Sequence, residues 1–245
     1  MKKLFYLLTL VLFLPFFSLS SDEFIIGVED TPYFPHYLYV NGEFVGYARA
    51  VFDAFSRYSG HTFIYKSYPV IELYNNFAAG KVDFKYPDHE YWGSQYKDGV
   101  DIHYSGAVVE YLDGVLVVPW RRGRGVDEIK VLGTYKGFTV WDYMDRIKSG
   151  RMRVKENPDF FDLLKSTIDG KVDAVYCNIS VTRYVLKQNL NKPNSLVFDP
   201  SLPHTRSDYK LSSIKHAKLI KEFDRFLTEK ESLIHRLKKQ YEVLL

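Results

Sequence analysis

Hydrophobic runs alternate with amphipathic stretches along most of the chain. The apolar run 24–28 has the composition of a buried parallel strand. At 47–58, apolar residues recur every three or four positions, which predicts a helix that Gly60 ends. Further helices are expected at 71–79, 140–148, 160–169, 180–189, 217–228 and 230–241. Short strands between these helices predict an α/β fold with mostly parallel sheets.

The sequence Gly-Lys-Val-Asp occurs twice, at 80–83 and at 170–173. In both places a helical pattern precedes the glycine, which accepts the left-handed conformation after a helix without a Cβ clash. A β-rich run follows and ends at Asp88 in the first copy and at Asn178 in the second. A four-residue echo can arise by chance, but the shared order of helix, glycine turn, strand and polar tip favours two related α/β lobes.

The connecting segments set the expected limits of these lobes. A hairpin is predicted at 37–45, closed by a type I′ turn at Asn41-Gly42. Asp113-Gly114 is interpreted as a turn between strands at 102–107 and 115–118. Composition breaks at 119–125 and 199–203 indicate where the chain leaves the first lobe and returns to it. We therefore expect lobe 1 to comprise 21–116 and 209–245, and lobe 2 to comprise 117–208.

The first twenty residues have the pattern of a secretory signal peptide. Lys2 and Lys3 precede an apolar run at 4–17, and Ser18 and Ser20 supply the small residues of a cleavage site after residue 20. This run is shorter than the ~20 apolar residues that a membrane-spanning helix needs, and no later stretch is apolar enough to span. We expect a soluble protein that is exported to the periplasm.

Charge and cysteine content exclude some classes of protein. Two of the 33 Lys and Arg residues lie in the signal peptide, so the exported chain is almost neutral against its 30 Asp and Glu residues. This balance argues against a nucleic-acid partner. Cys177 is the single cysteine, so no internal disulfide can form, and we expect it to be a small buried residue. We expect a monomer.

No catalytic or cofactor-binding motif is present. The seven histidines are scattered, and the sequence contains no HExxH, CxxC or GxSxG. His89-Glu90 together with His103 could be proposed as a metal site, but isolated histidines near strand ends more often lie at the surface or form hydrogen bonds. We therefore expect no cofactor and no metal.

Position along the chain indicates where a ligand would bind. Ligands of parallel α/β sheets bind beyond the carboxyl ends of the strands, and helix N-termini suit anionic or polar groups. Each residue at these ends also has a purely structural interpretation: the aromatic residues could pack a loop, Thr139 could cap the helix at 140–148, and the Asx residues could satisfy turns. The candidate ligand-binding residues are Tyr33, Phe34, Asp88, Trp92, Lys97, Gly137, Thr139 and Asn178.

An ordered set of short motifs resembles the family 3 extracellular solute-binding proteins, the polar amino-acid-binding receptors of ABC transporters. The resemblance covers essentially the whole exported chain. It implies a type 2 periplasmic-binding fold, in which two lobes are joined by two crossing strands and close over a ligand about a hinge. The matching residues are Ile26-Gly27-Val28, Pro32-Tyr33, Gly46-Tyr47, Pro69, Leu73, Gly80 to Asp83, Tyr104-Ser105, Val115 to Val118, and Gly170 to Ala174.

Two departures bear on the ligand that the resemblance implies. Family members that bind α-amino acids have an arginine before the Tyr-Ser strand, where it holds the carboxylate. This chain has only Lys85 and Lys97 there, and a lysine lacks the bidentate fork of an arginine. Such members also place an aspartate after the second-lobe strand for the amino group, and the matching residue here is the neutral Asn178. The resemblance therefore does not assign an amino acid to this chain.

We expect a non-enzymatic periplasmic receptor that closes over a small polar metabolite and presents it to the membrane subunits of an ABC transporter. Two alternatives remain open. Some dehydratases resemble this fold, and an enzyme of that kind would need an acid or base in the cleft, for which Asp88 is the candidate. A ligand sensor for a membrane receptor could have the same sequence features.

Overall fold

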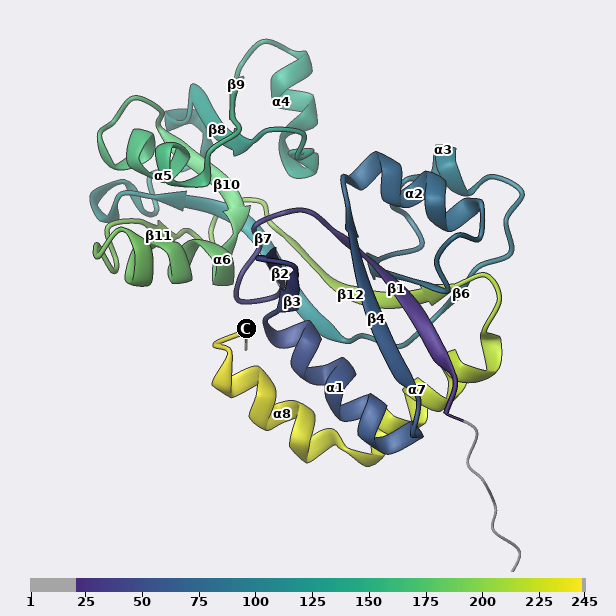
Figure 1. Ribbon diagram of the computed structural model, residues 1–245. Helices are drawn as coiled ribbons and strands as arrows, with labels where there is room; N and C mark the ends of the chain where they lie inside the picture. The colour runs from purple at the N-terminus through teal and green to yellow at the C-terminus, as the bar shows by residue number, and fades with distance from the viewer. Residues whose placement is uncertain (1–20, 244–245) are drawn as a thin grey trace, which may run out of the picture.

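The computed structural model describes residues 21–243, so the predicted signal peptide lies outside the described residues. One long sheet runs through the molecule, and its ends belong to two different lobes (Figure 1). The strand order is β4 (Thr62–Tyr68), β1 (Glu23–Glu29), β5 (Phe84–Asp88), β12 (Thr205–Ser213), β7 (Val109–Val117), β10 (Ala174–Asn178), β8 (Val131–Tyr135) and β9 (Arg153–Asn157). β6 (His103–Tyr104) pairs with β12, and β11 (Val197–Phe198) pairs with β7.

The nine-residue strands β7 and β12 join the two lobes. They pair antiparallel to each other over five residue pairs, from Thr205 opposite Asp113 to Tyr209 opposite Val109. β12 also pairs with β5 in lobe 1, and β7 also pairs with β10 in lobe 2. This arrangement confirms the predicted fold class of two α/β lobes connected by two crossing strands.

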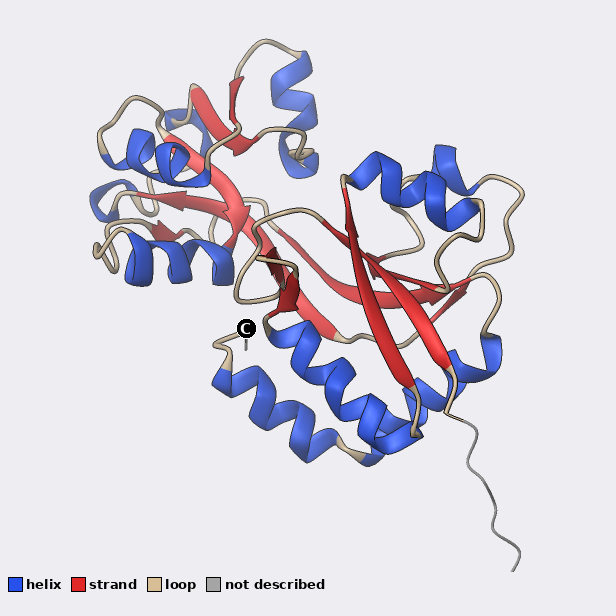
Figure 2. Ribbon diagram, viewed as in Figure 1, coloured by secondary structure: helices blue, strands red, loops and turns tan. Residues whose placement is uncertain are grey.

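Lobe 1 has helices on both faces of its part of the sheet (Figures 1 and 2). On one face lie α1 (Tyr47–Ser59), α7 (Ala217–Glu229) and α8 (Glu231–Gln240), and on the other lie α2 (Val70–Ala78) and α3 (Ser94–Lys97). Phe52 and Phe55 of α1 pack against Phe223 of α7, at ring-centroid distances of 5.8 and 4.9 Å. The predicted hairpin is present as β2 (Leu38–Val40) and β3 (Glu43–Val45), with positive φ at Asn41 and Gly42 as its turn requires.

Lobe 2 repeats the parallel strand arrangement on a smaller scale. β10, β8 and β9 run parallel, and β7 closes this part of the sheet antiparallel to β10. The helices are α4 (Met144–Lys148), α5 (Phe160–Ile168) and α6 (Ile179–Tyr184), and the last continues as a π-helical turn over Val185–Asn189. Short 3₁₀ helices cover Pro119–Arg121, Val126–Glu128 and Trp141–Tyr143.

The repeated Gly-Lys-Val-Asp sequence has the same structural role in both lobes. The Asp83 carboxylate accepts the backbone N–H of Ile25 (2.8 Å), and the Asp173 carboxylate accepts those of Lys130 (3.0 Å) and Val131 (2.9 Å). Each aspartate thus attaches the strand that follows it to the neighbouring parallel strand, β1 in lobe 1 and β8 in lobe 2. The echo in the sequence therefore marks equivalent units of the two lobes.

Two sequence-based predictions are wrong. Asp113-Gly114 is not a turn, because β7 runs through both residues; Gly114 is needed there because a Cβ would lie 2.6 Å from the Phe198 ring. Thr139 does not cap a helix: the Tyr143 N–H bonds to the Val140 carbonyl, so the helix begins one residue later and as a 3₁₀ turn. The helix predicted at 140–148 is correspondingly reduced to Trp141–Tyr143 and α4.

Candidate functional site

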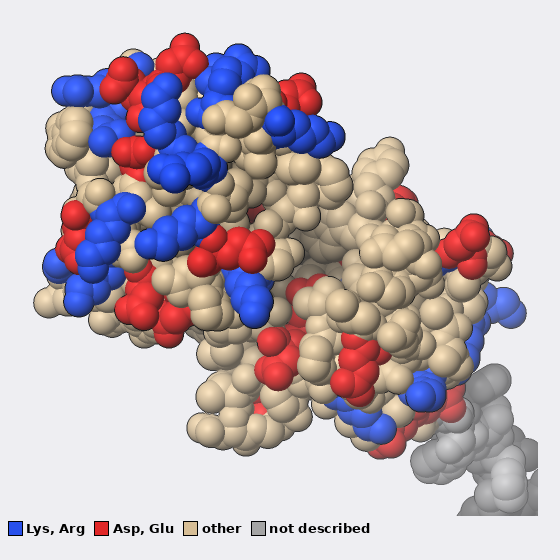
Figure 3. Space-filling view, turned by 90° about the horizontal axis from the view of Figure 1, so that it is seen from above, with Lys and Arg blue, Asp and Glu red and all other residues tan. Residues whose placement is uncertain are grey.

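The surface is hollowed between the two lobes (Figure 3). β7 and β12 pass from one lobe to the other beneath this region (Figure 1). Side chains alternate along a strand, and directly paired residues project to the same face of a sheet. Tyr111, Asp113, Thr205 and Tyr209 therefore share one face of the crossing strands.

Asp113 lies at the lobe 2 end of this paired stretch, opposite Thr205 of β12 and Asn178 of β10. Its side chain is half-buried, and Oδ1 accepts a hydrogen bond from Nδ2 of Asn178 (3.1 Å). Asn178 is oriented by α6, because its Oδ1 accepts the backbone N–H groups of Ser180 (3.0 Å) and Val181 (3.1 Å) as the helix cap. Among residues 21–243, no donor lies within hydrogen-bond distance of Asp113 Oδ2. One carboxylate oxygen is thus bound by Asn178, and the other accepts no hydrogen bond from the described residues.

Burial raises the pKa of Asp113 to about 7, although the Asn178 hydrogen bond opposes the shift; the nearby Asp142 adds to it. Asp142 stands at the start of the Trp141–Tyr143 turn, and its Oδ2 accepts the hydroxyls of Tyr176 (2.8 Å) and Thr205 (2.9 Å). These bonds connect lobe 2 to the crossing strand β12. Two carboxylates therefore lie near each other at this end of the hollow, and only Asp142 has its hydroxyl donors in place.

A cluster of aromatic rings lies near Asp113. Tyr111 and Tyr209 stack with centroids 4.5 Å apart, and Trp92 packs against both, at 6.1 and 5.8 Å. From lobe 1, Tyr33 reaches Phe138 of lobe 2 edge-on at 5.8 Å. The pKa of Tyr209 is raised above its ordinary value, chiefly by burial, and the charges of Tyr33 and Asp113 contribute. Tyr33, Tyr111 and Tyr209 are only 4–5% exposed, so these rings form a buried support for the region around Asp113.

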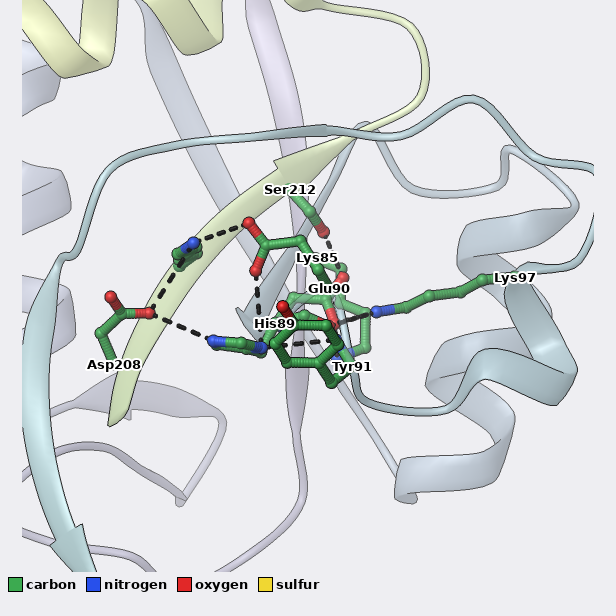
Figure 4. A network of polar contacts seen from close by, with 9 residues as sticks. Lys85, His89, Glu90, Tyr91, Lys97, Asp208 and Ser212 are labelled. Carbon is green, nitrogen blue, oxygen red and sulfur yellow. Dashed lines mark hydrogen bonds and ion pairs between the residues drawn. The ribbon is translucent and has the colours of Figure 1, made fainter. Parts of the chain in front are cut away.

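The carboxylate of Asp88 is bound inside the protein by a buried polar network, and Figure 4 shows the Lys85, Lys97 and Ser212 side chains of this network. Lys97 Nζ lies 2.7 Å and Lys85 Nζ 3.4 Å from Oδ1, and the Ser212 hydroxyl donates to Oδ2 at 2.6 Å. Asp88 and Lys85 are fully buried, and the Lys97 side chain is 8% exposed. Burial lowers the pKa of Lys97, and Asp88 opposes this shift. Both lysines near the end of β5 are thus neutralised inside the protein.

The structure also places the remaining predicted residues. Phe34 packs on Tyr184 of α6 at 4.5 Å, and so links the loop after β1 to lobe 2. Gly137, at φ +86°, and Thr139 are exposed near Phe138 in the loop that follows β8. Of the eight predicted residues, Tyr33, Trp92 and Asn178 lie around Asp113, while Asp88 and Lys97 bind each other.

Sequence analysis missed Asp113, Tyr111 and Tyr209. The Asp-Gly pair carries a strong turn signal, which concealed a strand. The same glycine could also have indicated a strand, since a glycine inside a strand marks the close approach of another group. Here that group is Phe198.

Comparison with known proteins shows similarity in structure without similarity in sequence. No family model matches the chain, and no curated protein matches it either. An ancestral arginine-binding protein bound to arginine superposes with a TM-score of 0.67 at 19% identity, covering 89% of this chain and 97% of the other. An arginine transport system periplasmic binding protein from Legionella pneumophila gives 0.66 at 16% identity, covering 90% and 100%. The second substrate-binding domain of Lactococcus lactis GlnP, in its open conformation, gives 0.65 at 15% identity, covering 91% and 96%.

These likenesses establish that the chain has the fold of periplasmic amino-acid-binding proteins. Within residues 21–243, no helix is long and apolar enough to cross a membrane. The same residues contain no group of three or more His, Cys, Asp or Glu side chains arranged to hold a metal ion.

Proposed function

We propose that this chain is a periplasmic, non-enzymatic solute receptor that closes its two lobes over a small polar metabolite and presents it to ABC-transporter membrane subunits. The observation that carries the proposal is that side chains from both lobes meet in the region of Asp113, whose Oδ2 accepts no hydrogen bond from residues 21–243. Tyr33 and Trp92 come from lobe 1, Asn178 and Phe138 from lobe 2, and Asp113 from a crossing strand. The hinge would lie in β7 and β12, near the boundaries 116/117 and 208/209 expected from the sequence.

Closure requires that the ligand contact both lobes. A ligand shifts an equilibrium between open and closed forms only by its difference in affinity for the two. A molecule bound at Asp113 would contact the loop after β1 on one side and the loop after β8 on the other. The similar structures support this proposal, since their names describe arginine-binding and substrate-binding proteins.

The proposal is tested by a thermal-shift screen of the purified exported protein against metabolites. A ligand at ~100 times its dissociation constant should add ~2.7 kcal/mol to the free energy of unfolding. Small-angle scattering of the protein with each hit should show a smaller radius of gyration, with an unchanged circular dichroism spectrum. A hit that raises the melting temperature but leaves the radius of gyration unchanged would contradict a closing receptor.

One observation favours the enzymatic alternative enough to test it. A carboxyl group with a pKa of about 7 in a hollow is suited to proton transfer at neutral pH, and Asp113 has this property, whereas Asp88 is fully paired. Incubation of each thermal-shift hit with the protein, followed by mass spectrometry, distinguishes a receptor from an enzyme. A receptor returns the hit unchanged.

A further inference from the structure

The positive charges of lobe 1 next to the hollow are already bound to carboxylates of the protein. Lys85 and Lys97 share Asp88, and Lys97 also donates to the His89 carbonyl at 2.7 Å. Lys210 pairs with Glu90 at 2.6 Å. A ligand carboxylate that approached these lysines would have to displace a buried internal ion pair, which is strongly unfavourable.

His36 adds no positive charge at neutral pH. The side chain is 1% exposed and packs edge-on against Tyr209 at 5.3 Å. Burial lowers the pKa of His36 to about 4, so that the ring is neutral under ordinary conditions. Neither ring nitrogen makes a hydrogen bond of ordinary geometry in the described part of the chain, and the nearby Asn178 side chain only opposes the effect of burial on the pKa.

The charge that remains open to a ligand is negative. Asp113 Oδ2 has no donor among the described residues, and the rings of Tyr33, Tyr111 and Tyr209 lie close enough to Asp113 for its charge to raise their pKa values. These three rings are only 4–5% exposed, so the carboxylate itself is the group that a ligand can reach, and direct charge attraction to it would stabilise an organic cation.

We infer that the hollow binds an organic cation of the amine or ammonium class through Asp113, and that it makes no clamp for a ligand carboxylate. This inference rests on the proposed function and specifies its ligand. One cation could contradict it: Lys136, exposed two residues before Phe138 at the lobe 2 rim, takes part in no ion pair within residues 21–243.

The test compares matched compounds that differ by one carboxylate. Calorimetric titration at pH 8 would use agmatine against arginine, histamine against histidine, tyramine against tyrosine, and choline against glycine betaine. We expect at least one cation to bind, and to bind at least about tenfold more tightly than its carboxylate partner. Asp113→Asn should lower the affinity for that cation by about 10- to 100-fold, because the variant loses a charged hydrogen-bond acceptor.

Two further variants keep the test independent of folding defects. Asp127→Asn removes the same charge from an aspartate that is 84% exposed and pairs with Arg146 on the lobe 2 surface, and it should leave affinity unchanged. Tyr111→Phe keeps the buried ring that stacks on Tyr209 and should bind nearly as well as the parent. Circular dichroism checks that each variant is folded.

Each other outcome overturns the inference in a recognisable way. If an amino acid binds as tightly as the matching amine, the protein has a clamp for the ligand carboxylate. A loss of amino-acid affinity in Lys136→Gln would then identify Lys136 as that clamp. The proposed receptor function would stand. Binding of a neutral metabolite from the thermal-shift screen, with no binding of any cation, also leaves the receptor function intact. A protein that binds no cation and no compound in that screen fails both proposals.

Discussion

Asp113 is a residue whose charge the fold does not fully compensate. Because its folded pKa of about 7 lies above the ordinary value of 3.8, the folded protein binds more protons than the unfolded chain between these pH values. The free energy of unfolding should therefore fall as pH rises from 4 to 7. Above pH 7 the carboxyl group is ionised in both states, so its contribution should no longer change with pH. We expect Asp113→Asn to have a free energy of unfolding ~1–3 kcal/mol higher than the parent at pH 8. One unit of pKa shift corresponds to ~1.4 kcal/mol, and the range allows for the partial exposure of the side chain.

Thermal unfolding at pH 8 and pH 4 measures this effect. The gain should be present at pH 8 and should disappear near pH 4, where the carboxyl group is protonated in both states. Asp127→Asn is the matched control: Arg146 lowers the pKa of that carboxyl group, so its removal should bring no gain at pH 8. An Asp113→Asn protein that is less stable than the parent at pH 8 would show that the carboxylate stabilises the fold.

Protonation of Asp113 should also control ligand binding. A cation binds the ionised carboxylate, so affinity should fall about tenfold per pH unit below the pKa of the free protein. The groups around Asp113 include Tyr33, Tyr111, Tyr176, Tyr209 and Cys177, whose pKa values are all raised by burial, so they stay protonated at neutral pH. Titration of the best cation at pH 5, 6, 7 and 8 checks this, and an affinity independent of pH over this range would exclude Asp113 as its partner.

At the scale of elements, the two Gly-Lys-Val-Asp units have the same role: the aspartate of each unit bonds to the backbone of the neighbouring parallel strand. Removing the carboxylate of Asp83 or Asp173 leaves the backbone N–H groups of Ile25, or of Lys130 and Val131, without their acceptor. Each of Asp83→Ala and Asp173→Ala should lower the free energy of unfolding by about 1–3 kcal/mol. Urea unfolding measures this, with Asp169→Ala as control, since Asp169 is exposed and its side chain accepts no hydrogen bond among residues 21–243. Equal stability of Asp173→Ala and Asp169→Ala would refute the role.

β7 shows what a sequence pattern can and cannot predict at this scale. Helices α1, α7 and α8 and the hairpin β2–β3 follow from local periodicity and turn residues, and the structure confirms them within about two residues. The crossing strand does not follow, because the need for Gly114 comes from Phe198, 84 residues later in the chain and on another strand. For the same reason the pairing of Lys97 with Asp88 could not be distinguished from a ligand contact by sequence alone.

Gly114 gives a direct test of this explanation. A Cβ at this position would lie 2.6 Å from the Phe198 ring and 3.1 Å from the His204 Cβ. Because His204 is fixed next to β12, Gly114→Ala should destabilise the protein by about 1–3 kcal/mol, the usual cost of overpacking. In Gly106→Ala the nearest atom is 3.6 Å away, so that variant should unfold at nearly the parent's urea concentration. A tolerated Gly114→Ala would mean that Phe198 can move.

For the whole molecule, contacts outside the crossing strands also join the lobes on one side. Phe34 packs against both Tyr184 of lobe 2 and Tyr241 beyond α8, and Lys187 pairs with Glu242 at 2.7 Å. The surface between the lobes is nevertheless hollowed (Figure 3). The two-lobe architecture was predictable because the repeat and the order of elements are local signals. Tyr33, Trp92 and Asn178 could be named as candidates from their positions at strand ends, but Asp113, Tyr111 and Tyr209 could not, because the hollow forms only when both lobes and both crossing strands meet.

Two of the three tryptophans provide a measure of closure, and the structure distinguishes them. Trp92 is half-buried against Tyr111 and Tyr209 in the hollow, whereas Trp120 is 61% exposed and lies under the guanidinium groups of Arg121 and Arg124. A ligand at Asp113 should change the environment of Trp92, since closure brings lobe 2 towards it, and should leave Trp120 unaffected. Trp92→Phe should therefore abolish most of the ligand-induced change in intrinsic fluorescence, while Trp120→Phe should keep it. Both variants should retain the ligand-induced rise in melting temperature, because a phenyl ring can still pack against the tyrosines. A fluorescence change that persists in Trp92→Phe and vanishes in Trp120→Phe would place the ligand, or the motion it causes, away from the hollow.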